Sequence, residues 1–285
     1  MDYNLCDPNT VERLLKKHGF TFSKALGQNF LIDEAVCPAM AAALRADEST
    51  GVLEIGPGIG VLTKELCEVA GKVAAIELDK RLYPLLAETL ADYDNFELIC
   101  GDVMKLDIAA LIKEHFADCS TVKVCANLPY YITSPVIMTL LESNLPIDEI
   151  VVMVQKEAAE RLCAEVGTRE AGAVTLAVQY YGDSEILFPV GKESFMPSPK
   201  VDSAVIRITL HRERPYAIED EKRFFSLVKA AFSQRRKTLV NSLSSTAGIP
   251  KAQLAEALKA LSLPQTVRAE NLTMEDFVSL YKALN

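Results

Sequence analysis

The sequence predicts a doubly wound α/β domain followed by a smaller, all-helical domain. Three observations predict this fold. Short runs rich in β-branched residues recur from about Val52 to Leu210, amphipathic stretches of helical length separate them, and strand patterning stops after His211. Such alternation is typical of parallel strands flanked by helices. The expected strands are 52–55, 73–77, 96–100, 122–126, 149–154, 185–188 and 203–210.

The helices are expected in the same order along the chain. Thr10 is in position to cap a helix over 11–18 that Gly19 closes, and Asp33 to cap a second helix running to about Leu44. Between the strands, length and spacing predict helices over 60–70, 81–90, 108–116 and 135–142. In the last quarter, an apolar stripe predicts a further helix with Phe224, Phe225, Leu227, Val228, Ala231 and Phe232 on one face.

The patterning therefore predicts two domains, residues 1–210 and residues 211–285, and their charges differ. The whole chain has a formal charge of −9 and a pI near 5.0. Residues 1–210 hold 18 basic and 31 acidic side chains, and residues 211–285 hold 12 and 8. The first part is thus strongly acidic and the second has a net charge of +4, which favours phosphate binding by the C-terminal domain.

Composition excludes several classes of protein. With 49% hydrophobic and 24% charged residues among 285, the chain is neither fibrous nor disordered. We expect no membrane span and no signal peptide, which makes the cytoplasm the expected compartment. The seven cysteines form no C-x-x-C pair and the three histidines are isolated, so we expect free thiols, no metal site and no histidine-dependent triad.

A glycine-rich turn follows the first expected strand, in the segment Val52-Leu-Glu-Ile-Gly-Pro-Gly-Ile-Gly60. Glycines at 56, 58 and 60 let a ligand approach backbone N–H groups, as in nucleotide sites of doubly wound folds. Because residue 61 is Val, the G-x-G-x-x-G spacing fails, which disfavours an NAD-dependent dehydrogenase. For this motif alone, a tight turn without a ligand remains an alternative.

Acidic residues end the next two expected strands. Glu77 closes the second strand, where a carboxylate can accept both hydroxyls of a ribose. Asp102 follows the third strand, where it can accept from the exocyclic amine of a base. Either acid alone is more often a helix cap. Three motifs at successive strand ends instead favour one nucleotide-binding crevice.

The fourth strand leads into Asn127-Leu128-Pro129-Tyr130. The Asn127 side-chain oxygen and a nearby carbonyl, that of Leu128 or Pro129, can accept the hydrogens of an exocyclic NH2 while Tyr130 stacks on the base. This arrangement directs the nitrogen lone pair toward an electrophile. Asn-x-Pro is also a common turn, so the motif needs its context.

Taken together, the motifs show that the chain resembles the adenine-N6 dimethyltransferases of small-subunit ribosomal RNA. The resemblance covers about Lys24 to Ser203 and extends into the C-terminal domain. In order, the matching segments are Lys24-Ala-Leu-Gly-Gln-Asn-Phe-Leu31, Glu54-Ile-Gly-Pro-Gly-Ile-Gly60, Glu77, Gly101-Asp102, Asn127-Leu-Pro-Tyr130, Phe195-Met-Pro-Ser-Pro-Lys-Val-Asp-Ser203 and Phe232-Ser-Gln-Arg-Arg-Lys-Thr-Leu239.

The resemblance implies a Rossmann-like, class I methyltransferase domain that uses S-adenosylmethionine to dimethylate two neighbouring adenosines near the 3′ end of 16S rRNA. Residues 1–210 would be catalytic and residues 211–285 would bind RNA. Asn29 and Leu31 would lie against the methionine part of the cofactor. The other implied cofactor residues are Gly56 and Gly58 at the turn, Glu77 on the ribose, Asp102 at the adenine amine, and Asn127.

For the target adenine, the resemblance implies contacts from Asn127, Leu128, Pro129 and Tyr130, with Phe195 as a second aromatic wall. Sulfonium methyl transfer is a direct displacement with a good leaving group. It requires positioning and amine polarisation rather than a histidine or a metal.

RNA binding requires cations, and Arg235, Arg236 and Lys237 supply three in succession. A charged triplet is commonly just a solvated helix face, but the charge of the C-terminal domain favours RNA here. Lys200 is expected to add a phosphate contact at the pocket rim. The resemblance implies 16S rRNA as the partner. Because the larger domain is acidic, we expect this RNA to be bound within the small (30S) subunit or its precursor rather than as free RNA. A monomer is expected, since the sequence shows no long apolar heptad pattern or unexplained apolar patch.

Three alternatives remain open from the sequence. The related 23S rRNA adenine methylases tend to be strongly basic and to carry Asn-Ile-Pro-Tyr, so the charge of −9 and Leu128 disfavour them. A non-catalytic checkpoint of ribosome assembly would use the same fold. The third alternative, a dehydrogenase, would bind a nicotinamide cofactor.

Overall fold

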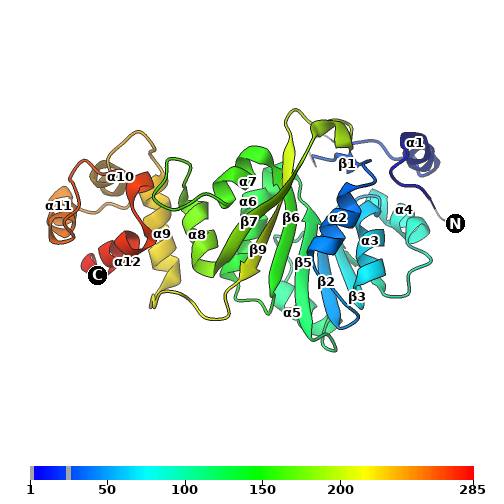
Figure 1. The fold of residues 1–285 in the computed structure, drawn as a ribbon, viewed down its shortest axis with the longest axis horizontal. Helices are drawn as coiled ribbons and strands as arrows, with labels where there is room; N and C mark the ends of the chain where they lie inside the picture. The colour runs from blue at the N-terminus through cyan, green and yellow to red at the C-terminus, as the bar shows by residue number, and fades with distance from the viewer. Residues whose placement is uncertain (1–2, 24–26) are drawn as a thin grey trace. The chain divides into compact units, whose positions relative to one another are not determined.

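The computed structural model describes residues 3–23 and 27–285, which form two compact units (Figure 1). The first unit is Met1–Ala159 with Ser184–Leu210, and the second is Glu160–Asp183 with His211–Asn285. One boundary falls at residue 210, where the patterning changes. Residues 160–183, however, belong with the C-terminal helices, which corrects the expected division. The reason is packing, because the hydroxyls of Tyr180 and Tyr181 donate to the Glu221 carboxylate at 2.8 and 2.9 Å.

The first unit is built on a seven-stranded sheet in the order β4-β3-β2-β5-β6-β9-β7. All seven expected strands form. They are β2 (Thr50–Ile55), β3 (Lys72–Glu77), β4 (Phe96–Cys100), β5 (Thr121–Asn127), β6 (Glu149–Gln155), β7 (Gly182–Val190) and β9 (Ser203–Leu210). Strands β2 to β6 pair in parallel.

Strand β9 departs from the expected parallel pattern, because it runs antiparallel to β6. Its first residue, Ser203, pairs with Gln155 at the end of β6. The start of β9 therefore lies at the same edge of the sheet as the ends of the parallel strands. A second, unexpected sheet joins β1 (Phe30–Leu31) to β8 (Phe195–Met196) in antiparallel fashion.

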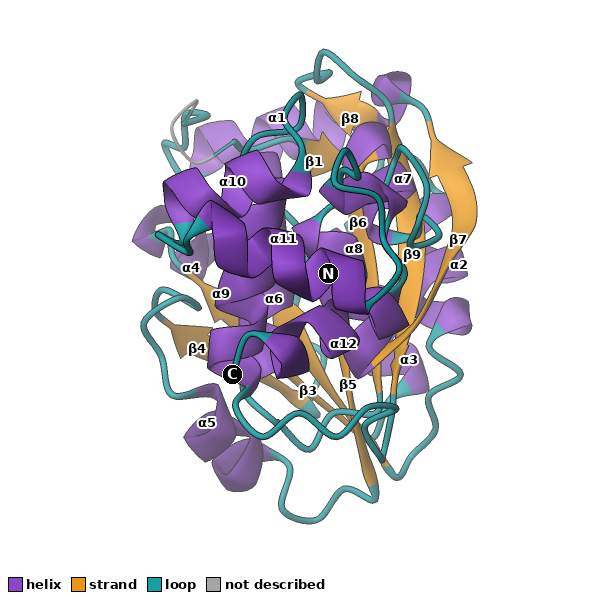
Figure 2. Ribbon diagram, turned by 90° about the vertical axis from the view of Figure 1, so that its left-hand side faces the viewer, coloured by secondary structure: helices purple, strands orange, loops and turns teal. Residues whose placement is uncertain are grey.

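Helices cover both faces of the large sheet. Helices α2 and α3 lie on one side of the strands and α5 and α6 on the other (Figure 2). A buried core of apolar side chains from α2, α3 and the strands fixes the first of these layers. The helices are α1 (Pro8–Lys17), α2 (Val36–Ala43), α3 (Val61–Val69), α4 (Tyr83–Thr89), α5 (Ile108–His115), α6 (Thr133–Glu142) and α7 (Lys156–Leu162).

Two expected helix caps are wrong. Helix α1 begins two residues earlier than Thr10, and Asp7 caps it by accepting from the Thr10 N–H at 2.9 Å. Asp33 does not cap α2, which begins at Val36 without a side-chain cap. Instead, the Asp33 carboxylate accepts from the Ala35 N–H and from the Ser194 hydroxyl. In both places a neighbouring acid or a tertiary contact outcompetes the expected cap.

The second unit is helical, as expected. Its helices are α8 (Ala173–Tyr181), α9 (Glu221–Phe232), α10 (Leu239–Thr246), α11 (Lys251–Ala260) and α12 (Met274–Ala283). The predicted stripe of α9 is buried except at Phe232, whose half-buried ring stacks on Phe277 with centroids 5.8 Å apart. Within the described part of the chain, no helix is long and apolar enough to cross a membrane. No disulfide joins any of the seven cysteines, all of which lie in the described chain, and Cys37, Cys67 and Cys125 are buried.

Candidate functional site

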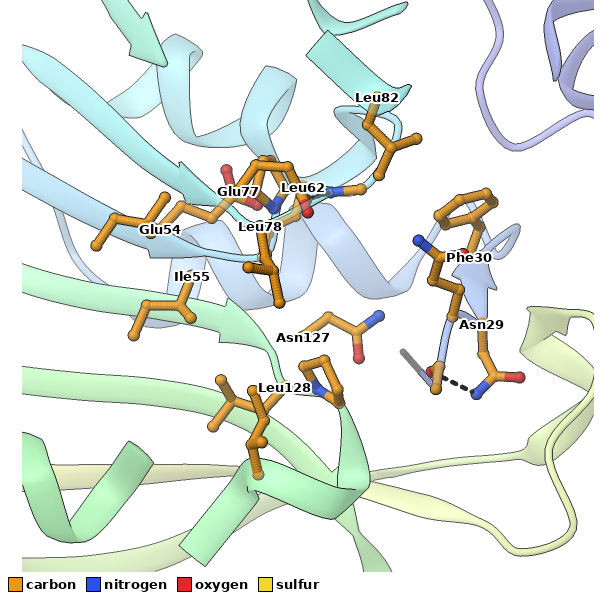
Figure 3. Close-up of a pocket in the computed structure, with 18 of the residues that line it drawn as sticks. Asn29, Phe30, Glu54, Ile55, Leu62, Glu77, Leu78, Leu82, Asn127 and Leu128 are labelled. Carbon is orange, nitrogen blue, oxygen red and sulfur yellow. Dashed lines mark hydrogen bonds between the residues drawn. The ribbon is translucent and has the colours of Figure 1, made fainter. Parts of the chain in front are cut away.

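A pocket opens at the carboxyl edge of the parallel strands of the first unit (Figure 3). Loops that follow β2, β3, β4 and β5 line it, together with β1 and β8. The structure brings together every residue that the sequence assigned to cofactor or target adenine: Asn29, Leu31, Gly56, Gly58, Glu77, Asp102, Asn127, Leu128, Pro129, Tyr130 and Phe195. Part of one quoted motif, Lys24–Leu26, lies outside the described residues.

The glycine turn forms the floor of this pocket. Gly56, Gly58 and Gly60 have φ of +73°, +61° and +93°, a region that favours glycine. A Cβ at Gly56 would meet no atom within 4 Å, and one at Gly58 would stand 3.3 Å from the Phe30 ring. The turn is thus open over Gly56. It fits the close approach of a cofactor to the backbone.

Glu77 is anchored to this turn. Its side chain is buried, with Oε1 accepting from the Asp79 N–H at 2.7 Å and Oε2 from the Gly58 N–H at 3.4 Å. Burial raises the pKa of Glu77, and these backbone donors oppose the rise. Each oxygen keeps a second lone pair, so the carboxylate fits a pair of ribose hydroxyls.

Asp102 lies at the end of β4, on the same side of the pocket. Its Oδ1 accepts from the Met104 N–H at 3.1 Å, and its Oδ2 lies 3.2 Å from the Lys105 ammonium. Two apolar side chains beside the acids, Leu78 and Met104, are 47% and 41% exposed and line the pocket. Sequence analysis missed them, although apolar residues one or two positions after acids at strand ends suit the faces of a flat ligand.

Glu54 is a second lining residue that the sequence analysis did not single out. It lies within β2, is 1% exposed, and its Oε2 has no hydrogen-bond partner among the described residues. Burial, together with the nearby Glu77, raises the pKa of Glu54 to about 8. A sequence feature could have indicated this residue, because Glu54 is the one charged side chain in the segment that forms β2. At neutral pH this acid is protonated and can donate a hydrogen bond into the pocket.

Asn127 is the last residue of β5, and its amide points into the space that the other labelled side chains surround (Figure 3). The next residue, Leu128, is buried and its N–H donates to the Met153 carbonyl at 3.2 Å. The Pro129 carbonyl accepts from the Ile132 N–H at 3.1 Å and the Thr133 hydroxyl at 3.3 Å. Because the Pro129 oxygen is already engaged, the Leu128 carbonyl is the better second acceptor for a substrate amine.

Aromatic and apolar walls complete the pocket. Tyr130 is half-buried and its hydroxyl lies 2.8 Å from Ser203 Oγ. Phe195 is buried, and the β1–β8 ladder pairs it with Leu31. On the same segment, the Asn29 amide donates to the Gly27 carbonyl at 3.1 Å, the dashed line in Figure 3. The small sheet thus brings together residues far apart in the sequence.

The four expected RNA-binding cations do not line the pocket. Lys200 is exposed in the first unit, between β8 and β9. Arg235, Arg236 and Lys237 are exposed in the second unit, in the turn between α9 and α10 rather than on a helix face. Arg235 Nη2 donates to the Arg169 carbonyl at 3.1 Å, which holds the turn against the loop before α8. The described residues contain no cluster of side chains suited to a metal ion.

Comparison with known proteins places this geometry in a family. A family model described as ribosomal RNA adenine dimethylase matches residues 19–285. A relative from Geobacillus thermodenitrificans (strain NG80-2), named ribosomal RNA small subunit methyltransferase A, is 47% identical, covering 100% of this chain and 98% of the relative. A protein of the same name from Bacillus pumilus (strain SAFR-032) is 45% identical with the same coverage.

Two solved structures resemble the chain at lower identity. A dimethyladenosine transferase from Plasmodium falciparum has a TM-score of 0.72 at 26% identity, covering 88% of this chain and 95% of that one. The 23S rRNA methyltransferase ErmE has a TM-score of 0.66 at 25% identity, covering 90% and 99%. The full-length relatives with 45–47% identity thus carry the small-subunit name, and the 23S enzyme is the more distant relative.

Proposed function

This chain belongs to the ribosomal RNA adenine dimethylase family, and from that membership we propose how its pocket works. The protein is an S-adenosylmethionine-dependent rRNA adenine-N6,N6-dimethyltransferase. We propose that the cofactor lies over Gly56 and Gly58, with Glu77 on its ribose and Asp102 at its adenine. Asn29 and Leu31 contact the methionine part. The observation that carries this proposal is the convergence of all these residues on one pocket.

We infer that the substrate is 16S rRNA within the small subunit or its precursor, and that two neighbouring adenosines near its 3′ end are modified. The name of the full-length relatives supports this target. A 23S rRNA substrate is disfavoured, because the identity to ErmE is 25%, against 45–47% for the relatives with the small-subunit name. A purely non-catalytic checkpoint is disfavoured because Glu77, Asp102 and Asn127 are all present and converge.

The target adenine is proposed to enter beside Asn127. The Asn127 side-chain oxygen and the Leu128 carbonyl accept the two N6 hydrogens, which directs the nitrogen lone pair toward the cofactor side of the pocket. Tyr130 and Phe195 hold the ring from either side. When bound, S-adenosylmethionine supplies an electrophilic methyl group. These residues then need only orient the amine, whose proton leaves after methylation has raised its acidity.

We propose that Lys200 and the turn Arg235–Lys237 contact RNA phosphates. All four side chains are exposed, and the Arg235 bond to the Arg169 carbonyl holds one end of the turn in place. A lysine or arginine that is not already neutralised by an acid can release counterions from RNA on binding. We further propose that the protein acts as a monomer in the cytoplasm, where its ribosomal substrate is assembled.

The deciding experiment is transfer of labelled methyl from S-adenosylmethionine to small subunits that lack the modification, with large-subunit RNA in parallel. Nucleoside mass analysis should find N6,N6-dimethyladenosine on the small-subunit RNA alone. Label on the large-subunit RNA would support the 23S activity instead. Firm subunit binding without label would support the checkpoint role.

A further inference from the structure

The target side of the pocket contains a hydrogen bond that the proposed chemistry does not use. The Tyr130 hydroxyl and Ser203 Oγ are 2.8 Å apart. Ser203 is fully buried and does not line the pocket, whereas Tyr130 does. A buried serine outside the lining of the pocket can influence a molecule bound there through the tyrosine hydroxyl that it contacts.

The fold explains how this serine reaches the pocket. Because β9 runs antiparallel to its neighbour β6, its first residue lies at the edge where the parallel strands end. Asn127 ends β5 at the same edge, and Tyr130 follows three residues later. Only the reversed direction of β9 places Ser203 beside Tyr130.

The backbone that carries Ser203 is itself anchored. The Asp202 carbonyl accepts from the Lys156 N–H at 3.0 Å, and the Asp202 Oδ1 accepts from the Lys192 N–H at 3.1 Å. Lys192 begins the short turn that leads into Phe195, the opposing wall. Asp202 thus connects Ser203, the partner of the tyrosine, with the turn that leads to Phe195.

We propose that Ser203 is a positioning residue, whose hydroxyl fixes the Tyr130 ring in the orientation that holds the target adenine for methyl transfer. This inference rests on the proposed function of Tyr130. The Tyr130 ring swings about its first side-chain torsion, χ1, and this motion displaces the hydroxyl, so a hydrogen bond at the hydroxyl restrains χ1. Methyl transfer requires the nitrogen and the methyl carbon in near-attack geometry, so a ring that swings freely about χ1 lowers the fraction of productive complexes.

The test compares Ser203→Ala, Tyr130→Phe and the double variant on small subunits that lack the modification. Each single change removes the same hydrogen bond and keeps the aromatic ring. We expect kcat to fall about three- to tenfold in each, the usual effect of losing one such bond. The KM for subunits and the Kd for S-adenosylmethionine should stay within about twofold, since phosphate and cofactor contacts are unchanged.

The double variant is decisive because the two changes remove one interaction. Its kcat should be no lower than that of either single variant. Losses that multiply in the double variant would overturn the proposal, as would a Ser203→Ala enzyme with kcat within about twofold of the wild type. If Ser203→Ala fails to fold, Tyr130→Phe measures the same bond from its other end, and an unchanged kcat there would equally overturn the proposal.

Thr50→Val provides a matched control. Thr50 is also buried and hydrogen-bonded, but it begins β2 at the opposite edge of the sheet. Its replacement should lower the melting temperature and leave kcat unchanged; a similar fall in kcat would make the Ser203 effect merely structural and overturn the proposal. Absence of methyl transfer by the wild type itself would instead overturn the proposed function, and this inference with it.

Discussion

The pocket of the first unit and the basic turn of the second unit are built on opposite physical principles. In the pocket, Glu54, Glu77 and Leu128 are buried, and hydrogen bonds to neighbouring backbone fix Glu77 and Leu128. The turn at Arg235–Lys237 is exposed, and of its three cationic side chains only that of Arg235 donates a hydrogen bond to another residue of the described chain.

This difference indicates how each region responds to change. Buried groups interact in a low dielectric, so that losing one is costly and their protonation depends on their surroundings. Exposed cations act through screened, roughly additive interactions. We therefore expect large, residue-specific and pH-dependent effects in the pocket, and small, cumulative and salt-dependent effects at the turn.

The largest effect is expected at Asn127. In Asn127→Ala, the substrate amine loses its side-chain acceptor, and kcat should fall by about 10²- to 10³-fold. Binding to small subunits should persist because the exposed cations remain. Single-turnover methyl transfer and subunit co-sedimentation would measure the two. Turnover near the wild-type level would show that Asn127 does not contact the reacting amine.

A pH-dependent effect on stability is expected at Glu54. Because its pKa in the folded protein is raised to about 8, the folded state retains a proton that the unfolded chain loses near the ordinary value of 4.5. Its contribution is therefore complete below about pH 4.5 and is lost as pH rises through 8. Between pH 6 and pH 9, the wild type should lose roughly 2–3 kcal/mol relative to Glu54→Gln.

Urea unfolding of both proteins at the two pH values would measure this difference. If the difference in the free energy of unfolding between the two proteins is the same at pH 6 and pH 9, Glu54 is ionised at both pH values and its charge is stabilised by an interaction partner. That outcome would weaken the contrast between the two regions, because burial would no longer control the charge of a pocket residue.

Cofactor affinity should respond to Glu77. Removing a charged acceptor of two ribose hydroxyls in Glu77→Ala should raise the Kd for S-adenosylmethionine about 10- to 100-fold, with subunit affinity unchanged. Since burial raises the pKa of Glu77, wild-type affinity should fall on acidification at a higher pH than an ordinary glutamate would give. Titration calorimetry across pH would test this, with the exposed Glu114→Ala as the matched control.

The smallest effects are expected at the turn. Alanine at Arg235, Arg236 or Lys237 should each weaken subunit binding only severalfold, and each should reduce the slope of log affinity against log salt by roughly 0.7–0.9. Filter binding at several salt concentrations would measure these slopes. Lys259→Ala, at an exposed cation on α11, is the control. An equal effect there would show that net charge, rather than this turn, governs binding.

The sequence alone was sufficient to predict the helices and strands whose local residue pattern is distinctive. All seven strands of the large sheet and the helical C-terminal region follow from local patterns. Short β-branched runs mark the buried strands, several of which are buried at nearly every residue, and apolar residues recur about every 3.6 positions in the helices. Strand ends meet at one edge of a parallel sheet, so the glycine turn, Glu77, Asp102 and Asn127 were expected together. Local pattern and topology agree at these positions.

Only the tertiary structure determined features that depend on distant partners. Residues 160–183 join the second unit through Tyr180, Tyr181 and Glu221, and no local pattern encodes such a contact. Asp7 rather than Thr10 caps α1, since neighbouring side chains compete for the same N–H groups. The direction of β9, and with it the Ser203–Tyr130 bond, depends on how β9 pairs with its neighbour β6 in the folded sheet. Periodicity predicts that a segment is a strand, whereas the direction in which it pairs is decided by the packing of the whole sheet.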